Sequence, residues 1–271
     1  MQEWKERTGM LVGEEMLKHF ADSTVAVIGV GGVGGYAAEM LVRAGIGHLI
    51  ILDSDVVSVT NKNRQLLALD STVGKPKCEV LAARLKDINP GLDLTIIASY
   101  LEAPSLRKDE VSSEGTPGAG PAEDNTPAGL LGGYRIDFLV DAIDTLAPKL
   151  ALIKYCVDNR IPHVSSMGAG AKYDVTKIRI ADISKSFSCP LAYVVRKRLR
   201  HMGISKGFKV VFSEELPDSN AIVPAEERNK KSQVGTISYL PAVFGCACAQ
   251  VAVQYLISSF SASSSVPASN N

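Results

Sequence analysis

The chain has 271 residues, which is long enough for one large α/β domain or for two small ones. Hydrophobic residues make up 46% and charged residues 21%, as in an ordinary globular protein, and 29 basic residues balance 29 acidic ones. A formal charge of zero excludes recruitment of nucleic acid by a global positive field, so such contacts would have to come from a local basic patch.

Neither the amino terminus nor the cysteines indicate a secreted protein. Residues 1–20 carry scattered charges and lack the apolar core of a secretory signal, which predicts a cytoplasmic location. The five cysteines are an odd number and are scattered along the chain, which argues against a disulfide framework. They include no Cys-x-x-Cys pair, which argues against a four-cysteine zinc site. The apolar segment 239–257 approaches the length of a membrane span but contains Gly245 and Gln250, so we expect a buried helix there and no membrane span.

Apolar periodicity and turn residues predict alternating strands and helices along most of the chain. Predicted strands lie at residues 24–28, 48–52, 94–101, 136–144, 161–166 and 208–215. Predicted helices lie at 13–20, before Gly45, within 72–91, and at 147–160, 190–203 and 239–257. The alternation predicts a Rossmann-like, doubly wound, mainly parallel α/β sheet with helices on both faces and a less regular carboxyl-terminal section.

The composition changes between residues 103 and 133, where Gly, Pro, Ser, Glu and Ala dominate and no apolar period survives. Such a segment cannot bury enough surface to offset the entropy of ordering, so we expect a disordered insertion there. Residues 260–271 have the composition of a loose tail. We therefore expect one domain over 1–258, with a nucleotide-binding core at 24–166 and a substrate-binding section at 167–258.

A glycine-rich turn joins the first predicted strand to the next helix. Gly29, Gly31 and Gly34 fit the spacing G-x-G-x-x-G, in which backbone N–H groups and the helix amino end cradle phosphate oxygens. Asp53 follows the next predicted strand, where a carboxylate can accept hydrogen bonds from ribose hydroxyls. Alone, these features favour a nicotinamide or flavin cofactor; the competing interpretation is a turn that only packs helix against strand.

Three further features weaken the redox interpretation. Gly32 adds a fourth glycine to the turn, which suits a closer approach of phosphate to the backbone. Asn61 and Arg64 follow Asp53 in a polar segment, and Lys77 lies at a predicted helix amino terminus, where a cation is unfavourable unless an anion binds there. Arg64 and Lys77 together suit a triphosphate under attack better than a bridging pyrophosphate.

Two further carboxylates lie at the end of the predicted strand in "FLVDAIDT". Asp141 and Asp144 would lie at the same edge of the sheet as the glycine turn, because parallel strands end at one edge. A carboxylate beside phosphates is typical of a magnesium site, which we predict at Asp144. The alternative is that Asp144 caps the helix starting near Ala147.

The segments "VIGVGGVGGYAAEMLVRAGIGHLIILDSD", "VTNKNRQLL", "VGKPKCEVLAARLKDINP" and "VDAIDTLAPKLAL" resemble those of the ubiquitin-activating-enzyme-like adenylating proteins. These include the sulfur-carrier activators of molybdopterin and thiamin synthesis. Within the superfamily, the chain most resembles the tRNA threonylcarbamoyladenosine dehydratases. The segments that carry this narrower resemblance are "ERTGMLVGEEMLKHFADSTVAVIG", "RIPHVSSMGAGAKYDVTKIRIADISKS", "PLAYVVRKRLR", "VVFSEE" and "GTISYLPAVFGCACA".

The resemblance implies ATP and Mg²⁺ as cofactors and assigns roles to individual residues. Asp53 would hold the ribose, Asp144 would bind Mg²⁺, and Arg7 would reach the ATP site of the partner in a homodimer. The glycines that would hold the ATP phosphates are Gly29, Gly31, Gly32 and Gly34. The side chains that would contact the phosphates are Asn61, Arg64 and Lys77, and the implied catalytic set is Arg64, Lys77, Asp144 and Arg7.

The implied reaction is an ATP-dependent adenylation of the carboxylate of N6-threonylcarbamoyladenosine, next to the tRNA anticodon, followed by cyclisation and dehydration. A tRNA substrate needs phosphate contacts. The basic segment "RKRLRH" predicts them at Arg196, Lys197, Arg198 and Arg200, with a solvated helix face as the alternative. A sulfur-transfer protein stays open as a further partner.

Three other functions stay open at this point. The chain could activate a ubiquitin-like or sulfur-carrier protein, but it lacks the two Cys-x-x-Cys pairs common in sulfur-carrier activators. It could be a catalytically silent nucleotide-binding subunit, although Arg64 and Asp144 are present. A NAD oxidoreductase is the remaining alternative. Cys189 is the cysteine to test for a thiol intermediate, with a structural role as the favoured interpretation.

Overall fold

The computed structural model describes residues 3–104, 124–227 and 230–264. Its α-helices are α1 (Glu6–Val12), α2 (Glu14–Asp22), α3 (Gly34–Ala44), α4 (Lys77–Ile88), α5 (Pro127–Leu131), α6 (Leu146–Asp158), α7 (Pro190–His201) and α8 (Tyr239–Ser264). Its strands are β1 (Thr24–Ile28), β2 (His48–Leu52), β3 (Asp93–Ile97), β4 (Phe138–Asp141), β5 (His163–Ser166), β6 (Ile178–Asp182), β7 (Lys209–Ser213), β8 (Ile222–Glu227) and β9 (Lys230–Val234).

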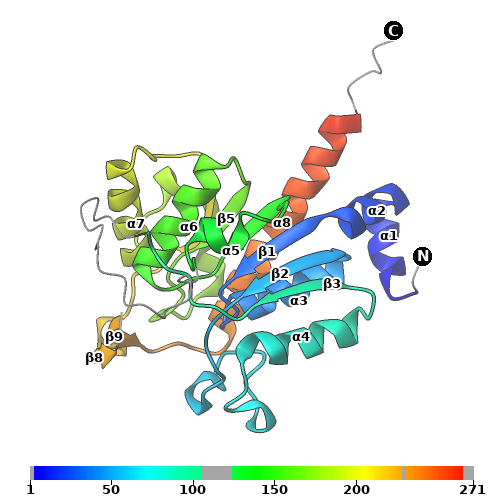
Figure 1. Cartoon of the computed structure of the whole chain (residues 1–271). Helices are drawn as coiled ribbons and strands as arrows, with labels where there is room; N and C mark the ends of the chain where they lie inside the picture. The colour runs from blue at the N-terminus through cyan, green and yellow to red at the C-terminus, as the bar shows by residue number, and fades with distance from the viewer. Residues whose placement is uncertain (1–2, 105–123, 228–229, 265–271) are drawn as a thin grey trace, which may run out of the picture.

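Within the described ranges, the first seven strands form one sheet in the order β3-β2-β1-β4-β5-β7-β6 (Figure 1). Neighbouring strands are parallel except β6, which runs antiparallel to β7. The prediction of a doubly wound, mainly parallel sheet is confirmed. Strand order reverses between β1 and β4, so the crevice outside their carboxyl ends is where such sheets bind ligands. We call this edge the carboxyl edge, and the opposite one the amino edge.

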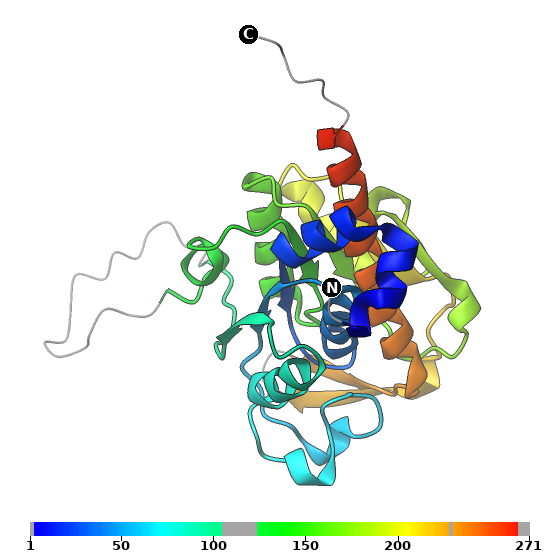
Figure 2. The same cartoon turned by 90° about the vertical axis from the view of Figure 1, so that its right-hand side faces the viewer.

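Helices cover both faces of the sheet, as Figures 1 and 2 show. Along β1, Val25 and Val27 pack toward α2, α3, α4 and α8, whereas Ala26 and Ile28 pack toward α5 and α6. A second apolar cluster joins α6 to α7 over β7. Because apolar layers lie on both faces, the central strands are continuous hydrophobic runs.

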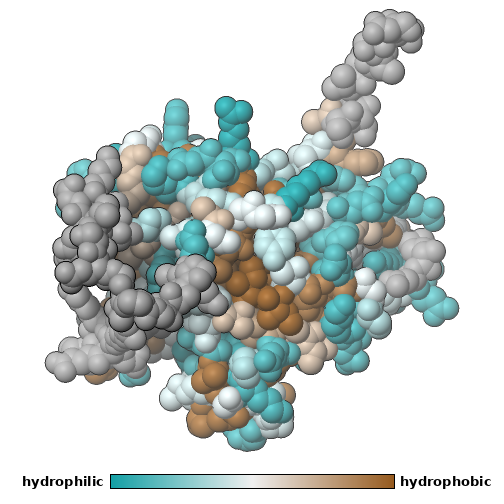
Figure 3. Space-filling model, in the orientation of Figure 1, coloured by the Kyte–Doolittle hydropathy of each residue, from teal (hydrophilic) through white to brown (hydrophobic). Residues whose placement is uncertain are grey.

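Hydrophilic side chains dominate the face drawn in Figure 3, apart from a hydrophobic area near its middle, around β3, and a smaller one on the protrusion at the bottom. This strand is an edge of the sheet, and its Ile96 is 43% exposed.

The long apolar helix α8 is a core element of the fold. By length and composition Tyr239–Ala262 could cross a membrane, but 56% of its apolar window is buried inside the protein. The close approach of α8 to α3 explains Gly245, since a Cβ there would lie 2.4 Å from the Val33 carbonyl oxygen. The prediction of a buried helix is confirmed, because its buried residues Leu240, Phe244, Cys248, Val251, Ala252 and Leu256 belong to the main core.

Several predicted boundaries need correction. Residues 105–123 of the segment predicted as a disordered insertion lie outside the described residues, but the end of that segment forms α5, whose Leu131 is fully buried. Residues 260–264 of the predicted tail belong to α8, which continues to Ser264, and residues 265–271 lie outside the described residues. The sequence also missed α1, β6 and the β8–β9 hairpin. The division into a nucleotide-binding core and a substrate-binding section stays a prediction.

Candidate active site

The glycine turn between β1 and α3 depends on glycine at two positions. Gly29 has a φ of +85°, and a Cβ on Gly34 would lie 1.7 Å from the Gly29 carbonyl oxygen. The turn leads directly into α3, so its backbone N–H groups and the helix amino end face the carboxyl edge. This arrangement binds phosphate in other α/β proteins.

The turn brings Arg64 into the site. A Cβ on Gly32 would lie 3.2 Å from Pro241 Cβ and 3.5 Å from Arg64 Cγ, so Gly32 lies between the start of α8 and Arg64. One terminal nitrogen of Arg64 donates to Thr60 O at 3.0 Å and to Asn63 Oδ1 at 2.7 Å. A guanidinium has five donors, so these contacts orient Arg64 and leave it able to bind phosphate.

Gln65, for which the sequence pattern predicts no role, lies on the other side of the turn. Its side chain is close to Gly31, where a Cβ would lie 3.5 Å from Gln65 Nε2. The residue is only 9% exposed, and its Oε1 has no hydrogen-bond partner among the described residues. A buried amide without a full set of partners fits a polar ligand at the glycine turn. The only feature of the sequence that could have indicated Gln65 as a site residue is its position directly after Arg64.

Asp53 links the end of β2 to the glycine turn. Its Oδ2 accepts from the backbone N–H of Val30 at 2.8 Å, and its Oδ1 accepts from the N–H of Asp55 at 2.8 Å. Burial raises the pKa of the Asp53 carboxyl, and the nearby Lys77 ammonium opposes this shift. Each carboxylate oxygen keeps a second acceptor site, so ribose hydroxyls could still donate to it.

Lys77 and Asn61 are held by local contacts at the same edge. Lys77 Nζ lies 2.6 Å from Asp55 Oδ2, and its side chain is 6% exposed. Asn61 Oδ1 accepts from the backbone N–H of Ser58 at 3.1 Å. Phosphate binding by Lys77 would therefore compete with its ion pair to Asp55, whose own side chain is 65% exposed.

A fully buried ion pair fixes the turn that leads to Asp144. Lys149 Nζ lies 2.8 Å from Asp141 Oδ2, and both side chains are 0% exposed. Lys149 also donates to Ile143 O at 2.9 Å, while Asp141 accepts from Ile143 N at 3.0 Å and from Ser165 Oγ at 2.5 Å. These contacts join β4, β5 and α6. The sequence did not identify Lys149, because its position in the first turn of an apolar helix gave no sign of its burial.

The same turn packs on the glycine turn. A Cβ on Gly29 would lie 3.0 Å from the Ala142 carbonyl oxygen, and Asp144 follows two residues later with an exposed side chain. Among the described residues no group of three or more His, Cys, Asp or Glu side chains could hold a metal ion. Mg²⁺ usually binds through one or two carboxylates together with substrate phosphates, which a single exposed Asp144 fits.

Arg7 is the predicted catalytic residue that the fold keeps away from this site. It is exposed on α1, next to Lys5, whose Cδ lies 3.9 Å from a Cβ built on Gly45. Gly45 ends α3 and precedes β2, so α1 lies at the amino edge. Within one chain, Arg7 and the glycine turn are thus at opposite edges of the sheet.

The predicted tRNA contacts on α7 differ in their surroundings. Arg196 donates to Ser186 O and Ser186 Oγ, both at 2.6 Å, whereas Lys197, Arg198 and Arg200 are exposed. The helix starts near the carboxyl edge and runs back to the start of β7, so its basic end lies at the amino edge. The hydrogen bonds to Ser186 therefore give Arg196 a structural role, unlike the three exposed cations.

Cys189, which precedes α7, is 4% exposed and packs in the cluster between α6 and α7. Its Sγ lies 3.7 Å from a Cβ built on Gly168. This environment agrees with the structural role that the sequence favoured.

Comparisons with known proteins agree with the geometry. The model of the ThiF family matches residues 6–269. A Bacillus subtilis protein named tRNA threonylcarbamoyladenosine dehydratase is 41% identical over 211 residues, which are 78% of this chain and 74% of the relative. An Escherichia coli protein of the same name is 39% identical over 235 residues, which are 82% and 80% of the two chains.

A solved structure extends this similarity to the whole fold. The crystal structure of an E. coli tRNA N6-threonylcarbamoyladenosine dehydratase in complex with ATP has a TM-score of 0.80 and 33% identity. The match covers 97% of this chain and 98% of that one. The chain belongs to the ThiF family of adenylating enzymes.

Proposed function

We propose that this protein is an ATP-dependent tRNA threonylcarbamoyladenosine dehydratase. The main support is the meeting of the glycine turn, Arg64 and the Asp144 turn at the switch point of the sheet. The relatives that match over most of the chain carry this name, and one of them was solved with ATP bound. The names of these relatives also make three alternatives less favoured: an activator of a carrier protein, a silent subunit and a NAD oxidoreductase.

The first step is attack by the threonyl carboxylate of the modified adenosine on the α-phosphorus of ATP. A bond forms between a carboxylate oxygen and phosphorus, the bond to the bridging oxygen breaks, and pyrophosphate leaves with the electron pair. The nucleophile is already deprotonated, so the step needs positioning and charge stabilisation more than a general base. Arg64 and Lys77 would stabilise the developing negative charge, Asn61 would contact the phosphates, and Asp53 would orient the ribose.

The second step closes the ring. A carbamoyl nitrogen forms a bond to the activated carbonyl carbon, the bond from that carbon to the AMP oxygen breaks, and the nitrogen loses its proton. AMP leaves, and the nucleoside has lost the elements of one water. The glycines Gly29, Gly31, Gly32 and Gly34 would keep the phosphates fixed while leaving the α-phosphorus open.

Further elements of the proposal concern the metal and the partners. Asp144 would hold Mg²⁺ together with the ATP phosphates, and the ion would supply positive charge there. Arg7 would complete the site of the other subunit in a homodimer, because α1 keeps it away from its own glycine turn. Phosphates of the tRNA would contact Lys197, Arg198 and Arg200. A cytoplasmic location and a sulfur-transfer partner stay predictions.

The direct test uses ATP, Mg²⁺ and tRNA that carries threonylcarbamoyladenosine, with mass spectrometry of the nucleosides. We expect the wild type to remove one water per nucleoside and Arg64→Ala to slow this by at least about 100-fold, the usual effect of losing one transition-state donor. Arg135→Ala is the control, because Arg135 has a side chain that is 91% exposed and precedes β4 at the amino edge. An unchanged nucleoside mass with the wild type, or full conversion by Arg64→Ala, contradicts the proposal.

A further inference from the structure

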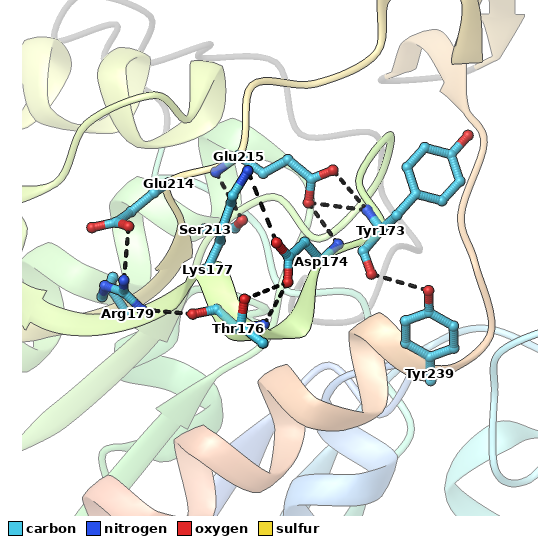
Figure 4. Close-up of polar contacts among 9 residues, drawn as sticks. All are labelled: Tyr173, Asp174, Thr176, Lys177, Arg179, Ser213, Glu214, Glu215 and Tyr239. Atoms are coloured by element: carbon cyan, nitrogen blue, oxygen red, sulfur yellow. Dashed lines mark hydrogen bonds and ion pairs between the residues drawn. The ribbon is translucent and has the colours of Figure 1, made fainter.

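Two exposed tyrosines lie at the start of α8, the helix that packs on the glycine turn, and we call them the tyrosine pair. Tyr239 begins α8 two residues before Pro241, which packs on Gly32. Tyr173 follows β5, and its carbonyl oxygen accepts a hydrogen bond from Tyr239 Oη at 3.0 Å (Figure 4). Despite these contacts, Tyr173 is 54% exposed and Tyr239 is 46% exposed.

The loop that carries Tyr173 is held in a strained conformation. Ala171 has a φ of +57°, which is unusual for a residue with a Cβ. Its N–H donates to Gly235 O at 2.8 Å, and its carbonyl oxygen accepts from Asp218 N at 2.8 Å. Strain of this kind persists where surrounding contacts impose it, and it is frequent at binding sites.

Glu215, just after β7, fixes the backbone on the other side of Tyr173. Its carboxylate accepts from the N–H of Tyr173 at 3.0 Å and from the N–H of Asp174 at 2.8 Å (Figure 4). Elements β7 and α8 therefore hold the turn from two directions. A ring presented on a fixed backbone loses little conformational entropy when a ligand stacks on it.

The charges around the tyrosine pair do not suit a phosphate. Asp174 follows Tyr173 in the chain, and the Glu215 carboxylate accepts from the Tyr173 N–H. The cations nearby already have partners: Arg179 lies 2.9 Å from Glu214 and Lys177 lies 3.9 Å from Asp174. Lys172, which is 2% exposed, donates to Ser213 O at 3.3 Å. Aromatic rings without spare positive charge fit a nucleobase better than a backbone phosphate. The base of ATP would lie elsewhere, since Asp53 would hold its ribose on the β2 side of the glycine turn.

From this placement we propose that the tyrosine pair is a stacking platform for an unpaired base of the substrate RNA, next to the modified adenosine. The inference rests on the proposed function, because it takes RNA as the substrate. It places the anticodon loop over the carboxyl ends of β5 and β7, with the threonyl carboxylate directed at the glycine turn.

Kinetics with tRNA carrying threonylcarbamoyladenosine test the platform. Tyr173→Ala should raise the KM for tRNA by about 5- to 150-fold, the loss expected when one stacked base loses its ring, and leave the KM for ATP unchanged. Tyr173→Trp should restore the KM, because it keeps an aromatic face. Tyr134→Ala is the matched control, since Tyr134 is 43% exposed but precedes β4 at the amino edge.

Fluorescence gives a readout that does not depend on turnover. Trp4 is the one tryptophan of the chain, so Trp4→Phe combined with Tyr173→Trp places a single reporter in the tyrosine pair. We expect an anticodon stem-loop with the modification to quench this reporter, and ATP alone to leave it unchanged.

The outcomes separate the platform from the proposed function. An unchanged KM for tRNA in Tyr173→Ala, with an active wild type, overturns the platform alone, as does a rise in the KM for ATP instead. A wild type that converts no tRNA overturns the proposed function, and the quenching experiment then still decides whether the tyrosine pair binds the RNA.

Discussion

His163 lies at the start of β5, where its imidazole is buried. The residue is 8% exposed, its ring stacks on Phe208 with 4.8 Å between ring centroids, and its Nδ1 lies 2.9 Å from Ile161 O. Nε2 has no partner among the described residues, so the ring is most stable as the neutral tautomer that donates from Nδ1. Burial lowers the pKa of His163, because the charged form is poorly solvated there.

This lowered pKa predicts a loss of stability in mild acid. The pKa of His163 in the unfolded chain is about 6.5, and above that pH the imidazole is neutral in both the folded and the unfolded state. Below that pH the imidazole becomes protonated in the unfolded chain but stays neutral in the folded protein. The free energy of unfolding should therefore fall as pH drops through this window, by about 1.4 kcal/mol for each unit between the two pKa values. Urea unfolding at about pH 7.5 and about pH 5.5 measures the fall, which should be smaller in His163→Leu. An equal fall in both proteins would show that His163 is not the source.

Some residues of the site could be predicted from the sequence because their constraint is local. Gly29 and Gly34 are in close contact within one turn, so the spacing of glycines in the motif is enough to predict that contact. Gln65 and Lys149 could not be predicted, since their roles depend on partners that only the fold brings close. Arg64 is intermediate: its type and position suggested phosphate, but its distance from Gly32 came from the structure.

At the scale of elements, the turn between β4 and α6 depends on the buried pair of Lys149 and Asp141. Removing one partner leaves an uncompensated buried charge, so Lys149→Met should lower the free energy of unfolding by about 3–5 kcal/mol. The double variant Lys149→Met with Asp141→Asn removes both charges at similar volume and keeps an acceptor for Ile143 N. We expect it to recover much of the loss in urea unfolding. A double variant as unstable as the single one would mean that packing, and not charge, sets the cost.

Strand β6 and helix α1, which the sequence missed, lack the apolar periodicity that reveals the other elements. Strand β6 has no strong alternation of buried and exposed residues and is recruited by antiparallel pairing with β7. Helix α1 has no buried residue and is joined to α2 through Gly13. By contrast β1 and β2 match their predicted bounds, because both of their faces are buried and turn residues flank them.

At the scale of the molecule, the basic face of α7 and the glycine turn lie far apart. A helix of 12 residues is about 18 Å long, and α7 runs from the carboxyl edge to the amino edge. Tyr193, Lys197 and Arg200 are exposed at spacings of four and three residues, so they share one face of the helix. A tRNA bound at the active site could follow this face away from the glycine turn.

The double variant Lys197→Ala with Arg200→Ala tests this path. It should weaken tRNA binding and reduce the dependence of log Kd on log salt concentration by roughly 0.7–0.9 for each phosphate that the protein no longer neutralises. The KM for ATP should stay unchanged, because these side chains lie toward the amino edge. Lys18→Ala with Arg135→Ala is the matched control, since both residues are exposed and Lys18 lies on α2, on the other side of the molecule in Figure 1. If the two double variants give the same salt dependence as the wild type, α7 is a solvated helix face and the tRNA phosphates bind elsewhere.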